Sequence, residues 1–286
     1  MSLPLVWFIT GASSGLGRQL ALEALSRGDK VVASARATSV AKLADLKEKG
    51  ADALELDATL PLEKLQEVAK KAAAVHGRID VLVNTAGYIL IGPMEETTPE
   101  ETLKQFNANV FGALNVTRAV LPYMREKKAG TIIFAGSICG LESTPFAGIY
   151  AATKWALRGV SQSLHDEISP LGLRSLCIDF GYFRTAILQN GRLVTHESAL
   201  ADYQDRFEQG KQFVQSYSGH QPGDPAKGAK VVVDVIKGEG VAAGKAFPRS
   251  LVLGTDCYNA AKKEVEGERE RLEEWKGVSL STDFTN

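Results

Sequence analysis

Cysteine is scarce in this chain of 286 residues, which has only Cys139, Cys177 and Cys257. Their number is odd, they lie far apart, and no Cys-x-x-Cys pair occurs. A disulfide framework needs paired cysteines, and a zinc site needs clustered ones. The spacing therefore predicts reduced thiols, which together with the absence of a recognisable targeting signal favours a cytoplasmic location.

An excess of charge of one sign is also missing. Lysine and arginine number 33 and aspartate and glutamate 34, which gives a formal net charge of -1. Such a balance provides no electrostatic attraction to nucleic acid or to an anionic membrane. No apolar run reaches the roughly 20 residues of a transmembrane helix, and the apolar start MSLPLVWFIT lacks the basic residues of a signal peptide. We therefore expect neither a nucleic acid nor a membrane as partner.

What the chain does contain is an alternation of short β-branched runs with longer helical segments. Six runs have the length of buried strands: LVWFIT (5–10), KVVASA (30–35), ALELD (53–57), IDVLVN (79–84), GTIIFAG (130–136) and LRSLCID (173–179). A seventh strand is expected around 250–253. Strands separated by helices favour a parallel sheet covered on both faces. We predict an α/β fold in which a single domain, 1–286, holds one Rossmann-type doubly wound parallel sheet of strand order 3-2-1-4-5-6-7.

Two helix starts and two atypical segments stand out from this alternation. Thr98-Pro99-Glu100-Glu101 and Asp224-Pro225 each place a capping side chain before a proline, as at the first turn of a helix. The segment 186–221 breaks the alternation and is either a substrate-binding lid or ordinary core packing. The charged helical tail, 256–286, is either solvated or in contact with a partner.

A glycine-rich turn follows the first predicted strand at GASSGLG (11–17). Glycine allows a tight turn and a close approach of the backbone to a ligand, and the helix that follows presents free N–H groups to a phosphate. The spacing is G-x-x-x-G-x-G, not G-x-G-x-x-G, and a turn without a ligand is the competing interpretation. Its place between strand and helix favours a dinucleotide phosphate site. The expected contacts are Gly11, Ser13, Ser14, Gly15, Leu16 and Gly17.

The end of the second predicted strand, at 34–36, indicates which dinucleotide binds. In such folds an acid at this place holds the ribose 2′-hydroxyl of NAD, whereas an arginine suits the 2′-phosphate of NADP. No carboxylate occurs there, and Arg36 can form charge-assisted bonds to a phosphate, with a hydroxyl from Ser13 or Ser34. We therefore predict NADP(H); the alternative is that Arg36 only begins a solvated helix. Asp57, after the third strand, either accepts from the adenine amino group or caps the next segment.

With these elements the chain resembles the short-chain dehydrogenase/reductase family from about Leu5 to Thr185, and more loosely to Asp256. TGASSGLG (10–17) is similar to the cofactor turn of the family, NTAG (84–87) to its N-x-A-G element, and YAATK (150–154) to its Y-x-x-x-K motif. Asn109, in NANVFG, and Ser137, in front of the Y-x-x-x-K motif, also match. The pattern is similar to fungal carbonyl reductases of the 17β-hydroxysteroid dehydrogenase-like type. It departs from the family at 180–181, where Phe-Gly replaces the frequent Pro-Gly.

The resemblance implies roles for these residues. It implies cofactor contacts from Asn84, Ala86, Gly87, Tyr150, Lys154, Gly181 and Thr185. Lys154 would also bind the nicotinamide ribose, and Asn109 would hold a water that links Lys154 to solvent. It further implies a homodimer or homotetramer, paired through the fourth and fifth helices.

The chemistry follows from Tyr150, Lys154 and Ser137. Positions 150 and 154 lie one helical turn apart and share a face. A tyrosine titrates near pKa ~10, and a nearby ammonium lowers that pKa. Tyr150 is therefore expected as general acid for reduction and base for oxidation, with Ser137 bonded to the substrate oxygen and no metal required. Apolar pocket walls are expected from 138–142, Tyr88, Phe146, Phe183 and 186–221.

These residues together predict an NADP(H)-dependent oxidoreductase that interconverts a carbonyl and a secondary alcohol on a mainly hydrophobic small molecule. Two alternatives stay open on the sequence. One is an enzyme of the same fold that catalyses a net non-redox isomerisation or cyclisation. The other is a non-catalytic NADP(H)-sensing binding protein, for which the Ser–Tyr–Lys group would have no use.

Overall fold

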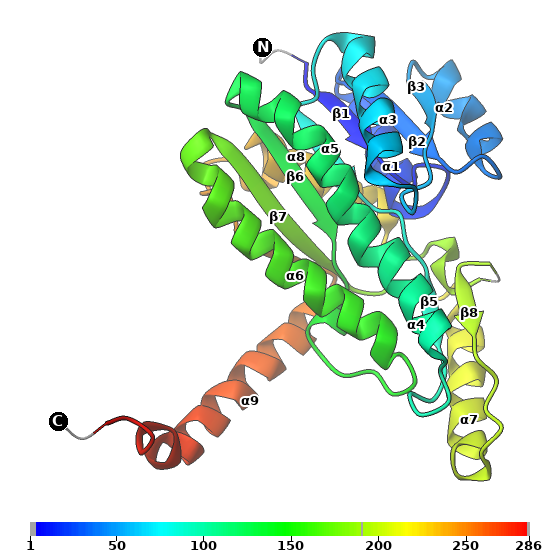
Figure 1. Ribbon diagram of the computed structural model, residues 1–286, viewed down its shortest axis with the longest axis vertical. Helices are drawn as coiled ribbons and strands as arrows, with labels where there is room; N and C mark the ends of the chain where they lie inside the picture. Colours follow the sequence, from blue (N-terminus) through cyan, green and yellow to red (C-terminus); the bar gives the residue numbers. More distant parts are fainter. Residues whose placement is uncertain (1–3, 190, 285–286) are drawn as a thin grey trace.

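The computed structural model describes residues 4–189 and 191–284, and there the chain forms a central parallel sheet with helices on both faces (Figure 1). Within these ranges the sheet has seven strands in the order β3-β2-β1-β4-β6-β7-β9. Their bounds are β1 (Val6–Ile9), β2 (Lys30–Ala35), β3 (Asp52–Glu55), β4 (Val81–Asn84), β6 (Gly130–Ala135), β7 (Leu173–Phe180) and β9 (Ser250–Leu253). The predicted fold and strand order are confirmed, since the fifth, sixth and seventh predicted strands are β6, β7 and β9. Residues 1–3, 190 and 285–286 of the predicted segments lie outside the described residues.

The helices form two layers because alternate side chains of a strand point to opposite faces of the sheet. Trp7 and Ile9 of β1 pack with α1 and α8, whereas Phe8 packs with α3, α5 and α6. The helices are α1 (Gly15–Ser26), α2 (Ala44–Glu48), α3 (Leu62–His76), α4 (Pro99–Phe106), α5 (Gly112–Lys127), α6 (Gly148–Ile168), α7 (Ala201–Tyr217), α8 (Pro225–Lys237) and α9 (Thr255–Leu280). None of the helices in the described ranges has the length and apolar character needed to cross a bilayer.

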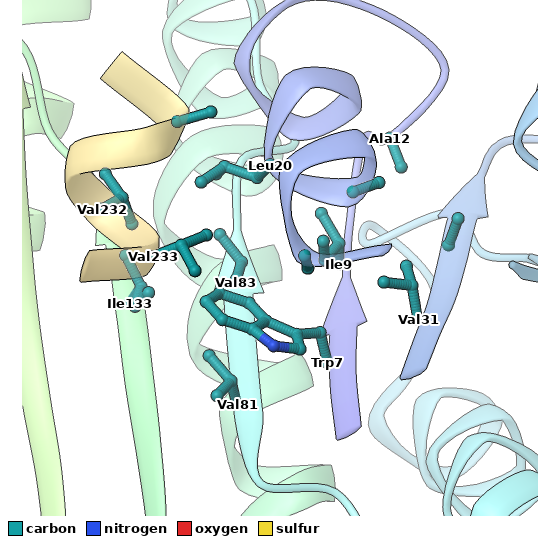
Figure 2. Packing of buried hydrophobic residues seen from close by; sticks show 14 of the residues in the cluster. Trp7, Ile9, Ala12, Leu20, Val31, Val81, Val83, Ile133, Val232 and Val233 are labelled. Carbon is teal, nitrogen blue, oxygen red and sulfur yellow. The ribbon is translucent and has the colours of Figure 1, made fainter. Parts of the chain in front are cut away.

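The first strand is held by a large indole in the core. Figure 2 shows Trp7 beside Val81 and Val83 of β4 and below Val233 of α8, and Trp7 is fully buried. Burial of a large apolar side chain stabilises a fold by roughly 1.5–3 kcal/mol. The indole N–H donates to Asp29 Oδ2 at 3.0 Å, so its polar atom is satisfied as well. This packing fixes the end of β1, from which the glycine-rich turn departs.

Both predicted helix starts are confirmed. Thr98 Oγ1 accepts from Glu101 N at 3.2 Å, and the Glu101 carboxylate accepts from Thr98 N at 3.0 Å, which makes a reciprocal capping box before α4. At α8 the Asp224 carboxylate accepts from the N–H groups of Ala226 and Lys227 at 2.8 and 3.2 Å. In both cases a proline opens the helix where its missing N–H removes no hydrogen bond.

Two short strands outside the main sheet were not predicted. β5 (Ile89–Ile91) pairs in parallel with β8 (Leu193–Thr195). Three residues are too few to show a strand period, and the partners are about a hundred residues apart in the chain, so neither strand has a local signal. The pairing attaches the beginning of the 186–221 segment to the stretch of chain that follows β4.

The other half of that segment and the chain end are helical. In α7, Phe207 is buried and packs edge-on against Phe146 with ring centroids 5.2 Å apart. In α9 only the first turns contribute to the core, through Cys257 and Ala260. Figure 1 shows the later turns of α9 projecting away from the sheet.

Candidate active site

The glycine-rich turn is packed directly on the chain after β4. Gly11 has φ +67°, and a Cβ there would lie 3.0 Å from Ala86 N. A Cβ on Gly17 would lie 2.5 Å from Thr85 Oγ1. The first position needs glycine for its conformation, and both need it for space. The turn therefore lies directly against the element that the resemblance assigns to the cofactor.

Helix α1 begins at the end of this turn with unused N–H groups. The extended Ser14 precedes the helix without a side-chain cap bond, and the first turn holds no acid. Gly15, Leu16 and Gly17 follow, and all four residues line a cavity. An uncapped helix N-terminus that faces a cavity provides donors and a positive dipole end for a phosphate.

The predicted catalytic residues line the same cavity, which we call the tyrosine cavity. Ser137 lies just beyond β6, and Tyr150 and Lys154 come from α6. All three are buried, with at most 9% of the residue exposed. The amine of Lys154 donates to Ala135 O at 2.7 Å. The fold thus brings the two predicted groups, the phosphate turn and the Ser–Tyr–Lys set, to one hollow.

Burial dominates the ionisation of these groups. Desolvation raises the pKa of Tyr150 above its ordinary value, the nearby Cys139 adds to the rise, and a hydrogen bond from Ser137 opposes it. Desolvation also lowers the pKa of Lys154, and the nearby Asp179 carboxylate opposes this. The expected lowering of the Tyr150 pKa is therefore wrong for the chain by itself, because burial disfavours the phenolate and outweighs the hydrogen bond from Ser137.

A buried ion pair lies directly behind Ser137. Asp179, at the end of β7, accepts from Ser137 N at 3.3 Å through Oδ1 and from Arg158 Nη1 at 3.0 Å through Oδ2. Its side chain is fully buried, and burial raises its pKa while Arg158 lowers it. This pair was not predicted, although an acid inside an apolar strand run is a signal for a buried partner.

A second cavity adjoins the first and we call it the arginine cavity. It is lined by Ser13, Arg36, Asp57, Ala86 and Gly87 of the predicted cofactor residues. Gly11 and Gly87 line both cavities, so the two are continuous. The Asp57 carboxylate accepts from Thr59 N at 2.9 Å and from its hydroxyl at 2.7 Å, so it stabilises the turn that follows β3, and its contact with the adenine stays a prediction.

Two predicted cofactor residues lie beneath the cavities rather than in them. Ser34 is fully buried, and its hydroxyl donates to Ile9 O at 3.1 Å, so it has no free face for a phosphate. Asn84 is also buried, and its amide donates to Thr117 Oγ1 of α5 at 3.1 Å. Neither lines the two cavities. Both side chains point into the protein because strand residues alternate between faces.

Asn109 is likewise taken up by protein contacts. It lies in a π-helical turn, Asn107–Phe111, between α4 and α5. Its amide donates to Tyr88 O at 3.0 Å and to Thr153 Oγ1 at 3.2 Å, and its oxygen accepts from Tyr88 N at 3.1 Å. The side chain thus fixes the backbone of Tyr88, a wall of both cavities. The relay of protons through a water at Asn109 stays a prediction.

The loop after β7 closes the tyrosine cavity. Gly181 and Thr185 of this loop line it, as does Phe180, the last residue of β7, so the Phe-Gly that departs from Pro-Gly lies at the wall. A Cβ on Gly181 would lie 2.0 Å from Asp256 Oδ1. Asp256, in the first turn of α9, therefore packs under this loop, and the start of the predicted tail supports the site.

The remaining walls are mostly apolar. Tyr88, Phe183 and the beginning of the 138–142 and 186–221 segments line the tyrosine cavity as expected. Phe146 does not, because its ring packs on Phe207 instead. Arg192, from the 186–221 segment, lines both cavities and was not predicted. The position of Arg192 depends on the pairing of β8 with β5, and no local sequence pattern predicted that pairing.

Known sequences resemble this chain over most of its length. A family model described as short chain dehydrogenase matches residues 5–193. Oxidoreductase BOA17 of Botryotinia fuckeliana (strain B05.10) is 31% identical over 280 residues, which cover 97% of this chain and 98% of that protein. A 3-ketodihydrosphingosine reductase of Bacteroides thetaiotaomicron is 34% identical over 206 residues, or 71% and 73% of the two chains.

Known structures resemble it as well. The crystal structure of a short-chain dehydrogenase from Streptomyces avermitilis has 37% sequence identity and a TM-score of 0.87, over 99% of this chain and 100% of that one. The closed form of a serine dehydrogenase complexed with NADP+ has 25% identity and a TM-score of 0.70, over 87% and 94%. The likeness therefore extends beyond the part that the family model matches.

Proposed function

Since this chain belongs to the short-chain dehydrogenase/reductase family, we propose that it is an NADP(H)-dependent oxidoreductase that interconverts a carbonyl and a secondary alcohol. The observation that carries the proposal is that Ser137, Tyr150 and Lys154 line one cavity with the uncapped start of α1. A dinucleotide phosphate held at that helix would place its other end toward the phenol. A binding protein without catalysis would not need this group.

The residues present fit a dinucleotide with a 2′-phosphate. Gly11 and Gly17 let the turn pack against Thr85 and Ala86, where a Cβ would collide, and α1 offers donors for a diphosphate. Arg36 and Ser13 line the continuous second cavity. Arginine binds phosphate through paired charge-assisted bonds. The serine dehydrogenase relative was solved with NADP+, which supports the same preference here.

In the proposed reaction a nicotinamide cofactor supplies or accepts the hydride, and the protein handles the proton. The Tyr150 hydroxyl gives its proton to the carbonyl oxygen during reduction, and the Tyr150 phenolate takes a proton from the alcohol during oxidation. The raised pKa of Tyr150 keeps the phenol protonated at neutral pH, as an acid catalyst requires. Ser137 Oγ donates a hydrogen bond to the same substrate oxygen. The Lys154 ammonium stabilises the phenolate that remains.

The substrate is proposed to be a mainly hydrophobic small molecule. Apolar and aromatic side chains form most of the tyrosine cavity, among them Tyr88, Ile138, Phe183 and Leu188. Such walls favour apolar ligands, with the few polar groups setting orientation. The name of the Bacteroides relative, 3-ketodihydrosphingosine reductase, supports a ketone as the reacting group.

The test is a panel of hydrophobic ketones and secondary alcohols with the purified chain. We expect at least one ketone to be reduced, with one NADPH consumed per alcohol formed, and a lower rate with NADH. Product formation without net NADPH consumption would instead identify an isomerase or cyclase. If the chain bound NADPH but turned over none of the compounds, isomerisable ones included, the result would favour a non-catalytic NADP(H)-sensing protein and contradict the proposal.

A further inference from the structure

Arg192 lies where the two cavities meet. It immediately precedes β8 and lines both the tyrosine cavity and the arginine cavity. Arg36, at the end of β2, lines the arginine cavity. The guanidinium groups of Arg192 and Arg36 take part in none of the ion pairs formed among residues 4–189 and 191–284. Two arginines of the described chain thus border one hollow without a protein counter-ion.

The backbone holds Arg192 in this place. Its carbonyl oxygen accepts from Ile89 N at 2.8 Å, and its N–H donates to Gln189 O at 3.1 Å. The next residues form β8, which pairs with β5. Just beyond β8, His196 Nδ1 lies 2.8 Å from a carboxylate oxygen of Glu101 in α4. Hydrogen bonds on both sides therefore fix the start of the Arg192 side chain at the rim of the cavities.

The electrostatics of this place are unfavourable without an anion. Burial lowers the pKa of Arg192, and the positive charge of Arg36 lowers it further. Like charges that are partly withdrawn from water repel each other more strongly than they do in bulk solvent. A phosphate placed between two guanidinium groups attracts both of them, which offsets their mutual repulsion, and it can accept bidentate bonds from each.

The acids on the wall of the arginine cavity are already engaged. The Asp57 carboxylate accepts two bonds from Thr59. The Glu101 carboxylate accepts from Thr98 N and pairs with His196, and these contacts lower its pKa. Both carboxylates are therefore held by other partners, and in the described part of the chain neither forms an ion pair with Arg192 or Arg36.

We propose that Arg192 binds the 2′-phosphate of NADP(H) jointly with Arg36, so that the phosphate is held between the end of β2 and the strand β8. The inference rests on the proposed NADP(H) dependence and adds a residue that the glycine-turn and strand-two motifs do not contain. The diphosphate has a different set of donors, the N-terminus of α1, which lines only the tyrosine cavity through Ser14 to Gly17. Cofactor recognition would thereby involve the segment that also forms part of the substrate wall.

The experiment compares three ligands, NADPH, NADH and adenosine 2′,5′-bisphosphate, by calorimetric titration of the full chain. For Arg192→Ala we expect the affinity for NADPH and for the bisphosphate to fall roughly ten- to a hundredfold, as for the loss of a charged hydrogen bond, with NADH affinity little changed. Arg192→Lys keeps the charge without the fork and should fall in between. Arg206→Ala is the matched control, since this exposed arginine of α7 lines neither cavity.

The outcomes separate this inference from the proposed function. Unchanged NADPH affinity in both Arg192 variants would overturn the inference while leaving NADP(H) dependence intact. An equal loss for NADPH and NADH would also overturn it, because the contact would then be to a group that both cofactors share. If the unaltered chain bound neither dinucleotide, the proposed function itself would fail. Circular dichroism of each variant excludes misfolding as the cause of a loss.

Discussion

The amine of Lys154 lies 5.5 Å from the centroid of the Tyr150 ring, one turn further along α6. The same amine is bonded to Ala135 O at the end of β6. The amine is thus fixed between the sheet and the phenol, where as an ammonium group it would stabilise a phenolate. This relationship underlies the first two predictions.

Replacement of the phenol should separate chemistry from binding. We expect Tyr150→Phe to lower kcat by roughly a hundred- to ten-thousandfold, because a positioned general acid contributes about that much. NADPH affinity should remain, since the phosphate turn is untouched. Steady-state rates with a ketone that the unaltered chain reduces measure kcat, and a titration with NADPH measures the affinity. Turnover near the level of the unaltered chain would contradict the assigned role.

The ionisation of Tyr150 should depend on the cofactor. Because burial raises the pKa, the phenol of the free chain should stay protonated to above about pH 10, the ordinary value for tyrosine. A bound NADP+ places a positive charge near the phenol, which favours phenolate and should move the transition to lower pH. The difference in tyrosinate absorbance between the chain and Tyr150→Phe isolates this group. Tyrosinate from Tyr150 near neutral pH without cofactor would contradict the prediction.

Cofactor preference should follow the charge at position 36. In Arg36→Asp a carboxylate replaces the guanidinium on the wall of the arginine cavity, where it would repel a 2′-phosphate and accept from a 2′-hydroxyl. We expect the ratio of kcat/KM for NADPH to that for NADH to fall by more than about tenfold. Kinetics with both cofactors measure it. An unchanged ratio would place the 2′-phosphate elsewhere.

The buried pair behind Ser137 should matter for stability in a pH-dependent way. Arg158→Met leaves the Asp179 carboxylate buried without its partner and should cost about 3 kcal/mol of unfolding free energy at neutral pH. The pKa of Asp179 is already raised by burial and should rise further, so the loss should shrink as the pH falls and the carboxyl takes a proton.

A second arginine–aspartate pair provides the control for this prediction. Arg249 and Asp166 form an ion pair whose side chains are more than half exposed, 56% and 63%. Arg249→Met should therefore change the unfolding free energy by no more than about 1 kcal/mol. Urea denaturation of both variants at neutral and acid pH gives the comparison. Equal effects of the two substitutions would show that the burial of Asp179 is unimportant.

Several features of the chain are local and were predictable. The strand runs, the glycine turn after β1 and the caps at Thr98 and Asp224 each depend on residues within a few positions of one another. The order of the sheet follows from general rules for parallel strands and their crossovers. The Ser137, Tyr150 and Lys154 group was recognisable because its spacing along the chain carries the signal.

The errors concern side-chain direction and burial. Ser34 ends up under the cavity because the face of a strand that meets the ligand depends on the layers packed on it. The raised pKa of Tyr150 comes from atoms of several elements that exclude water together. Neither the direction of the Ser34 side chain nor the burial of Tyr150 can be read from residue types, since both depend on neighbours that are distant in the chain.

The sequence by itself determined the fold class, the glycine turn and the Ser137, Tyr150 and Lys154 group, because these depend on short-range patterns. Only the tertiary structure decided that Arg192 borders both cavities, that Asp179 supports Ser137 and that Asp256 packs under Gly181. Each of these contacts joins segments at least about forty residues apart. Their geometry comes from how the sheet and its helices pack, which no local pattern encodes.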